Sequence, residues 1–241
     1  MKKKTTLGTI AALGFFALIF TTSCNKDASS GSSSTNTTVT EQDAADAITE
    51  AVTPESAGLS AQVNDATVIA TSNAFTCGTS YDSSIARSSA SGAAISYSFT
   101  LAWNWKLSCT SPANFTASFN GHTTYDAPRI SSNDSSNGSF VITGLAPADN
   151  AYTFNSTYVR NGSEQSKVNN KNSFTSKITI TSSNITVDKV TQEITGGTAA
   201  ATISGESSSG KSFSFSGNIT FNGNKKATLQ ITGGASYNIS W

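Results

Sequence analysis

The most constraining feature of the sequence is a strict alternation of residue types between positions 95 and 109. Eight consecutive odd positions carry apolar side chains, and the even positions between them carry polar or small ones: Ile95, Tyr97, Phe99, Leu101, Trp103, Trp105, Leu107 and Cys109 against Ser96, Ser98, Thr100, Ala102, Asn104, Lys106 and Ser108. A period of two places all the apolar side chains on one face of an extended strand. The run therefore predicts one strand of about 15 residues, buried on one face only, where five or six residues are usual.

Turn-forming residues recur after this strand at intervals of roughly 9 to 13 residues. They lie at Asn137-Gly138, Asp149-Asn150, Asn161-Gly162, Asn169 to Asn172, Ser183-Asn184, Gly196-Gly197, Ser209-Gly210, Asn222 to Asn224 and Gly233-Gly234. The segments between them alternate, which predicts about ten strands joined by short turns as an antiparallel meander. A loss of alternation between Val187 and Val190 predicts a β-bulge.

Strands with one apolar face must hide that face from water, and an open sheet of about ten strands tends to curl. The fold class that we expect is therefore all-β, a long-stranded antiparallel meander that forms a strongly curved sheet or a partly closed barrel. A two-sheet β-sandwich produces the same alternation and is the alternative.

One short helix is predicted before the strands, from about Glu41 to Val52. Thr40 precedes it, Asp43 stands where a capping-box carboxylate reaches back, and Pro54 follows its end. Its small apolar residues form one stripe at spacings of three and four: Ala44, Ala45, Ala47, Ile48, Ala51 and Val52. We expect this stripe to pack against the sheet, with a partner-binding helix as the alternative.

The N-terminal segment has the pattern of an export signal. Lys2 to Lys4 form a positive region, an apolar core runs from Leu7 to Phe20, and small residues precede Cys24. The apolar core has about 14 residues, whereas a helix needs roughly 20 to cross a bilayer, which disfavours a retained transmembrane anchor. Residues 1–23 are therefore predicted to be a signal peptide.

This arrangement resembles the signal of bacterial lipoproteins, and it is most similar to the relaxed versions found in Bacteroidota envelope lipoproteins. A common lipobox has Leu three residues before the cysteine, where this chain has Thr21, so secretion without lipidation is the alternative. The resemblance implies lipidation of Cys24 and a location in the cell envelope. The anchor would then be the outer membrane, and the membrane would be a partner through the N-terminal lipid.

The residue composition after position 23 predicts three successive segments. Residues 24–39 hold Cys24 and a Ser/Thr-rich run that cannot bury enough apolar surface to fold, which predicts a tether. Residues 40–74 are expected to contain the acidic helix and an extended segment, Leu59 to Ile69, that covers the concave side of the sheet or an edge. Residues 75–241 are the expected antiparallel β-domain.

Low charge and the two remaining cysteines are typical of an exported protein. Charged residues make up 12% of the chain, about half the usual share. No basic stripe of the kind that nucleic acid requires is present, so we expect no nucleic-acid partner. An oxidising compartment permits Cys77 and Cys109 to form a disulfide, with two separate buried thiols as the alternative.

Few residues point to catalytic or metal chemistry. The one histidine, His122, shares a strand face with Ser118 and Asp126, but residues four apart along a strand lie about 13 Å from each other, too far for a triad. The cysteines lack further ligands at zinc-like spacing. We therefore expect no catalytic residue, no metal site and no cofactor. A glycan-active enzyme that uses carboxylates such as Asp126, Asp149 or Glu164 is an alternative.

Three aromatic residues are the candidate ligand-lining residues: Trp103, Trp105 and Phe99. Aromatic rings dominate contacts with sugars and apolar ligands when they line a groove. All three also share the apolar strand face with Leu101, and ordinary core packing is the commoner role of such residues.

Together these patterns predict an exported, lipid-anchored envelope protein without catalytic activity. It would be a binding or structural module for an apolar or glycan ligand, and no oligomeric state is predicted. The alternative is an integral outer-membrane β-barrel, which the strand length and the pattern of Tyr237, Ile239 and Trp241 would suit.

Overall fold

The structure is a computed structural model that describes residues 38–72, 75–168 and 171–241, so the predicted signal peptide and Cys24 lie outside the described residues. The helices are α1 (Glu41–Val52), the 3-10 turn η1 (Pro54–Ser56) and α2 (Leu59–Thr71). The strands are β1 (Ser80–Ser88), β2 (Ser96–Ser108), β3 (Asn114–Asp126), β4 (Ile130–Thr143), β5 (Ala151–Ser166), β6 (Ser173–Asp188), β7 (Ile194–Ser207), β8 (Ser212–Gly223), β9 (Lys226–Ile231) and β10 (Ser236–Ser240).

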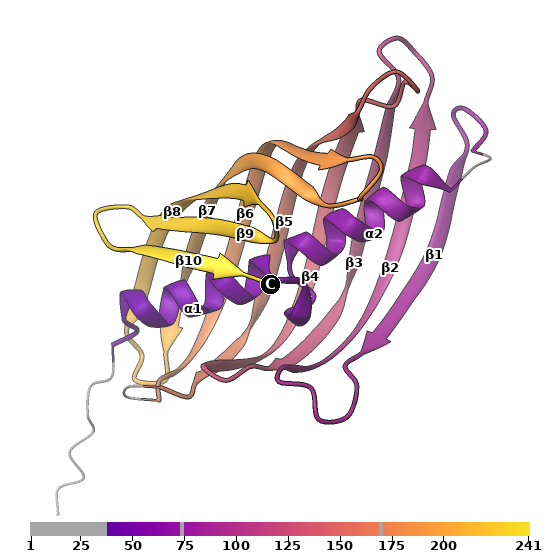
Figure 1. Ribbon diagram of the computed structural model, residues 1–241. Coiled ribbons are helices and arrows are strands. Elements are labelled where there is room, and N and C mark those ends of the chain that lie inside the picture. Colours follow the sequence, from indigo (N-terminus) through magenta and orange to yellow (C-terminus); the bar gives the residue numbers. More distant parts are fainter. Residues whose placement is uncertain (1–37, 73–74, 169–170) are drawn as a thin grey trace, which may run out of the picture. The chain divides into compact units, whose positions relative to one another are not determined.

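The ten strands form one sheet in which each strand pairs with the next along the chain, antiparallel throughout. The sheet curves strongly and remains open, because β1 and β10 are its two edges, and both helices lie across its concave face (Figure 1). The expected all-β meander in a curved sheet is confirmed. The sandwich alternative is wrong, since the described strands belong to a single sheet.

The predicted long strand is confirmed as β2, which has 13 residues and alternates between buried odd positions and exposed even ones over most of its length. Strands β3 to β8 have 12 to 16 residues each. Their inward faces supply the apolar side of the core, with Leu101, Phe140, Phe154 and Ile178 all at 1% exposure or less. The outward faces carry mainly Ser, Thr and Asn.

Four of the predicted turns lie instead inside strands. Asn137-Gly138 is in β4, Asn161-Gly162 in β5, Ser183-Asn184 in β6 and Gly196-Gly197 in β7. The glycines serve close approach between strands, because a Cβ atom on Gly138 would lie 2.5 Å from a ring carbon of Phe119, and one on Gly162 would lie 2.5 Å from the Cβ of Asp134. The strands are therefore longer than the spacing of these pairs predicted.

The remaining turn predictions agree with the structure where it can be compared. Turns follow β4, β7, β8 and β9 at the predicted positions, whereas residues 169 and 170 of the Asn169 to Asn172 turn lie outside the described residues. The predicted bulge falls earlier than expected. The register of β6 against β7 shifts between Ser183 and Val187, where Asn184 has a left-handed φ of 58°, and Val190 belongs to the following turn.

Helix α1 begins as predicted. The Thr40 hydroxyl accepts a hydrogen bond from the Asp43 amide, and the Asp43 carboxylate accepts one from the Thr40 amide, which completes a capping box. Asn172 then donates to both the Asp43 carboxylate and the Thr38 carbonyl, so the helix start is tied to the start of β6. Val39 is buried, and the packed body therefore already includes the last residue of the predicted tether.

The segment predicted as extended, Leu59 to Ile69, is helical and forms most of α2. Leu59, Val63 and Ala66 are buried at spacings of four and three, which is a helical period. Buried polar residues interrupt this pattern in the sequence: Thr67 donates to the Val63 carbonyl one turn back, and Gln62 donates to the Ala57 carbonyl. These bonds allow polar side chains to lie inside the helix layer.

Acidic side chains of the helices pair with basic side chains of the sheet along the rim. Asp46 of α1 accepts from Arg129 at 2.9 Å, and Asp65 of α2 accepts from Arg87 at 2.6 Å. Glu41 accepts from the Tyr237 hydroxyl at 3.0 Å, which joins α1 to β10. The helix layer is therefore fastened to both edges of the sheet and to the turn between β3 and β4.

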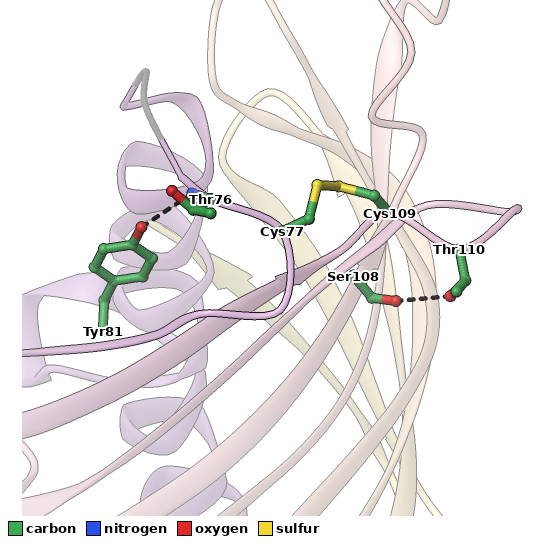
Figure 2. The surroundings of a disulfide bond; sticks show 6 residues. All are labelled: Thr76, Cys77, Tyr81, Ser108, Cys109 and Thr110. Atoms are coloured by element: carbon green, nitrogen blue, oxygen red, sulfur yellow. Dashed lines mark hydrogen bonds between the residues drawn. A yellow bond between two sulfur atoms is a disulfide. The ribbon is translucent and has the colours of Figure 1, made fainter.

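Cys77 and Cys109 form the predicted disulfide, with their Cα atoms 5.7 Å apart. It joins the chain entering β1 to the end of β2, as Figure 2 shows, and the neighbouring Tyr81 hydroxyl accepts a hydrogen bond from the Thr76 amide. The bond thereby ties the edge strand β1 to its one partner strand, β2.

Replacement of Cys77 by Ser should lower the free energy of unfolding by about 3–4 kcal/mol, because a cross-link over about 30 residues restricts the unfolded chain. Urea unfolding measures this, and the wild-type protein in reductant should unfold at the midpoint of the variant. An unchanged unfolding midpoint in the variant would contradict the assignment of a stabilising Cys77–Cys109 disulfide.

Candidate binding site

The aromatic residues singled out in the sequence lie in the core between the sheet and the helices. Phe99 and Trp103 are only 3% and 2% exposed, and Trp103 packs against Phe119 and Phe140 with ring centroids 5.0 and 6.0 Å away. Trp105 is half-buried near the disulfide, where its ring lies 6.4 Å from that of Tyr81. With the helices in place, the rings of Phe99 and Trp103 contact other core side chains, and binding there would require the helices to move.

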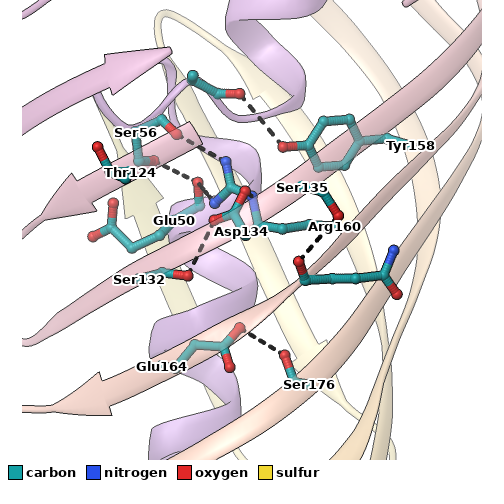
Figure 3. A network of polar contacts seen from close by, with 12 residues as sticks. Glu50, Ser56, Thr124, Ser132, Asp134, Ser135, Tyr158, Arg160, Glu164 and Ser176 are labelled. Carbon is teal, nitrogen blue, oxygen red and sulfur yellow. Dashed lines mark hydrogen bonds and ion pairs between the residues drawn. The ribbon is translucent and has the colours of Figure 1, made fainter. Parts of the chain in front are cut away.

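A buried charged cluster occupies the centre of the concave face (Figure 3). Arg160 is fully buried, and its Nε lies 3.4 Å from a carboxylate oxygen of Asp134 on the neighbouring strand. The guanidinium also lies over the rings of Tyr125 and Tyr158, at 5.1 and 5.8 Å from their centroids. Burial of an isolated cation is costly, and these contacts offset part of that cost.

Arg160 and Tyr158 also hold the helix layer, because the Tyr158 hydroxyl donates to the Ala57 carbonyl at 3.4 Å. We call these two residues with Asp134 the Arg160 clamp. Arg160 donates to the Ser56 carbonyl at 2.8 Å and to the Glu50 carbonyl at 3.3 Å. The last carbonyls of a helix lack partners within it and favour a positive charge, and Glu50 lies in the last turn of α1. The clamp therefore fixes the junction of α1 and α2 against the sheet.

Glu164, one of the carboxylates considered for catalysis, lies in the same cluster. It is 2% exposed, and one of its oxygens accepts from the Ser176 hydroxyl at 2.7 Å. Burial raises the pKa of Glu164 to about 7, and the nearby Asp134 carboxylate adds to the rise, whereas Ser176 and Arg160 oppose it. Asp126 and Asp149 lie elsewhere, exposed at the end of β3 and in the turn after β4. The structure thus separates these three carboxylates into different surroundings.

An open groove of about 410 Å³ lies outside the core, where the helix layer meets the turns at one end of the sheet. Its apolar part consists of Trp241, Val63, Ile194 and Pro54. The amides of Asn64 and Gln192 line it as well. A concave surface with an aromatic ring and a few polar groups is the usual composition of a ligand site.

Two turns build the wall of the groove opposite α2. Gln192, after β6, and Lys225, between β8 and β9, both have a left-handed φ of 58°. The Lys225 carbonyl accepts a hydrogen bond from the Trp241 amide at 3.0 Å, and the Lys225 ammonium lies 3.5 Å from the Glu193 carboxylate. These contacts hold Trp241 and Glu193 at the rim.

Ser60 gives the groove a buried polar group. This residue is 6% exposed, it lines the groove from the first turn of α2, and its hydroxyl has no hydrogen-bond partner among the described residues. A buried hydroxyl without a partner costs about 1–3 kcal/mol. A ligand that donates to or accepts from this hydroxyl would remove the cost.

Sequence patterns did not reveal this groove, because its residues come from four distant segments: residues 54–64, residues 191–194, Lys225 and Trp241. Pro54 was noted only as the end of a helix, and Trp241 only for its place in a strand pattern. The left-handed positions at Gln192 and Lys225 carry no glycine that would have marked them.

No known protein family, no curated protein and no solved structure matches this chain. Within the described ranges, no group of three or more His, Cys, Asp or Glu side chains is arranged to hold a metal ion. The helices of the same part of the chain are too short or too polar to cross a membrane. The groove and the buried cluster are therefore the features that bear on function.

Replacement of Glu164 by Gln should remove a pH dependence of stability. The folded-state pKa of about 7 exceeds the ordinary value of 4.5, so the contribution of Glu164 to stability is complete below pH 4.5 and is lost as the pH rises through 7. The wild-type free energy of unfolding should fall relative to Glu164→Gln by up to about 3 kcal/mol across this range. Chemical unfolding between pH 4 and 8 tests this, with Asp149→Asn as the exposed control; parallel profiles would refute it.

Replacement of Arg160 by Met should destabilise the protein by about 3–5 kcal/mol, because the Asp134 carboxylate would stay buried without its partner. The double variant Arg160→Met, Asp134→Leu removes both charges and should recover most of that loss. Thermal and urea unfolding of the three proteins measures the effect. Equal losses of stability in the single and double variants would show that the unpaired Asp134 carboxylate does not cause the destabilisation.

Proposed function

We propose that the protein is an exported, lipid-anchored module of the cell envelope that binds a ligand in its outer groove and catalyses no reaction. The observation that carries this proposal is the contrast between a filled interior and an open groove. Trp103 is 2% exposed and Arg160 fully buried, whereas the groove of about 410 Å³ opens to solvent beside Trp241.

Binding without catalysis is favoured by the surroundings of the groove carboxylates. Glu55 is exposed, and the Glu193 side chain is 46% exposed and paired with Lys225. A carboxyl group that acts as a general acid at neutral pH needs an apolar pocket that holds its proton. The carboxyl groups whose pKa is raised by burial, Glu164 among them, do not line this groove.

A tethered module is favoured over an integral outer-membrane barrel by the outer face of the sheet. A membrane barrel needs an apolar band that faces lipid. The outward side chains of β4 and β5 are instead almost all Ser, Thr, Asn or Gln: Ser131, Asn133, Ser135, Asn137, Ser139, Val141 and Thr143 on β4, and Thr153, Asn155, Thr157, Val159, Asn161, Ser163 and Gln165 on β5.

Anchoring would rest on Cys24 and the Ser/Thr-rich residues that follow. The packed body includes Val39, so about 14 residues would connect it to the lipid, with a root-mean-square reach of about 20 Å for a flexible chain. That distance would hold the groove clear of the lipid surface.

Replacement of Cys24 by Ser should move the protein from the membrane fraction to the soluble fraction and abolish metabolic labelling with palmitate, because multiple acyl chains make anchoring durable. Fractionation and labelling of a Bacteroidota host that expresses the full chain measure both results. Cys77→Ser is the matched control and should keep the label. Unlabelled wild-type protein would refute the anchor.

A further inference from the structure

We infer that the groove beside Trp241 binds uncharged pyranose sugars, an inference that rests on the proposed binding function and names its ligand class. The apolar part of the groove is a half-buried indole with the side chains of Val63, Ile194 and Pro54 next to it. Sugar rings present C–H groups on their faces, and an aromatic ring with aliphatic neighbours buries such a face without demanding a charge.

The polar part of the groove matches hydroxyl groups, each of which both donates and accepts. Asn64 and Gln192 each offer an amide with two donors and one acceptor, and Glu55 and Glu193 offer acceptors. A purely apolar ligand such as an acyl chain would leave these groups without partners, which costs binding energy. The arrangement therefore favours a ligand rich in hydroxyl groups.

The Ser60 hydroxyl is the most specific feature of the groove. Ser60 lines the groove and is 94% buried, and its hydroxyl oxygen is buried without a partner among the described residues. Buried polar groups are rarely left unsatisfied, and each exception calls for a water, an ion or a ligand. Rotation of the Ser60 side chain toward the groove would let a sugar hydroxyl that enters beside Trp241 satisfy it.

The charges of the groove select against acidic sugars. Lys225 compensates Glu193 at 3.5 Å, whereas Glu55 forms no ion pair within the described part of the chain. The lining therefore carries a net negative charge that repels uronic acids and phosphorylated glycans. Its volume of about 410 Å³ lies at the small end for ligand sites, so one or two sugar rings would contact it directly.

The three tryptophans make a direct test possible, because each indole N–H gives one NMR signal and only Trp241 lines the groove. The full chain, labelled with ¹⁵N and purified in a detergent without a sugar headgroup, is titrated separately with cellotriose, maltotriose, triacetylchitotriose and, as the acidic probe, trigalacturonate. We expect at least one uncharged probe to shift the Trp241 signal in a saturable manner and to leave the Trp103 signal unchanged. The trigalacturonate titration should shift neither.

Two groove variants and one control separate binding from folding. Trp241→Ala should weaken binding of the active probe about tenfold or more through loss of the ring contact. Ser60→Ala should weaken it about fivefold or more, while its melting temperature stays equal to that of the wild type or rises, because no internal hydrogen bond is lost. Thr181→Ala, exposed on the outer face of β6, should bind as the wild type does.

The inference is overturned if no uncharged probe shifts the Trp241 signal, if the Trp103 signal shifts instead, if trigalacturonate binds best, or if Ser60→Ala binds as tightly as the wild type. Lipidation of Cys24 without sugar binding would leave the anchored module in place with a different ligand. Sugar binding by a chain that is never lipidated would retain the ligand class and refute the anchor. Release of reducing ends from a bound probe would show an enzyme instead of a binding module.

Discussion

The structure depends on one constraint: a sheet that is apolar on a single face and does not close on itself must be covered from within. The edges β1 and β10 stay apart, so the side chains of the concave face would meet water if α1 and α2 were absent. The alanines of α1 allow its backbone to lie close to the sheet, and six of its residues are apolar and at most 1% exposed. The ion pairs at the rim and the disulfide at the β1 edge then secure an arrangement that hydrophobic burial drives.

The Arg160 clamp explains why the helices occupy one position on that face. An apolar surface offers little to define where a helix lies along it, whereas hydrogen bonds from Arg160 to the carbonyls of Glu50 and Ser56 specify one place. Buried ion pairs contribute little net stability, and their benefit in some proteins is conformational specificity. We regard this as the role of the clamp, with Glu164 adding a sensitivity to pH.

Much of the fold follows from the sequence, because burial on one face imposes a period of two wherever a strand is long. Residues close together in the sequence predicted the β2 strand and the capping box of α1. The expected oxidising compartment predicted the disulfide. The predictions of turns at Gly162 and Gly138 were wrong. The sequence does not distinguish a glycine in a turn from a glycine inside a strand whose lack of a side chain leaves room for the neighbouring strand. The buried charges were overlooked although Asp134 and Arg160 share parity with apolar residues such as Phe140 and Tyr158. The groove could not be predicted from the sequence, because its residues come from four segments that only the folded chain brings together.

The most direct test of this account is native-state hydrogen exchange of the full chain. If the helix layer is an integral part of the core, the amides of α1 near Ile48 and those of β4 and β5 near Phe140 and Tyr158 should exchange through the same opening, with one free energy and one dependence on denaturant. Exchange of the α1 amides at a free energy several kcal/mol lower, while the sheet stays protected, would mean that the helices detach on their own. The interior, and not the outer groove, would then be the place to look for a ligand.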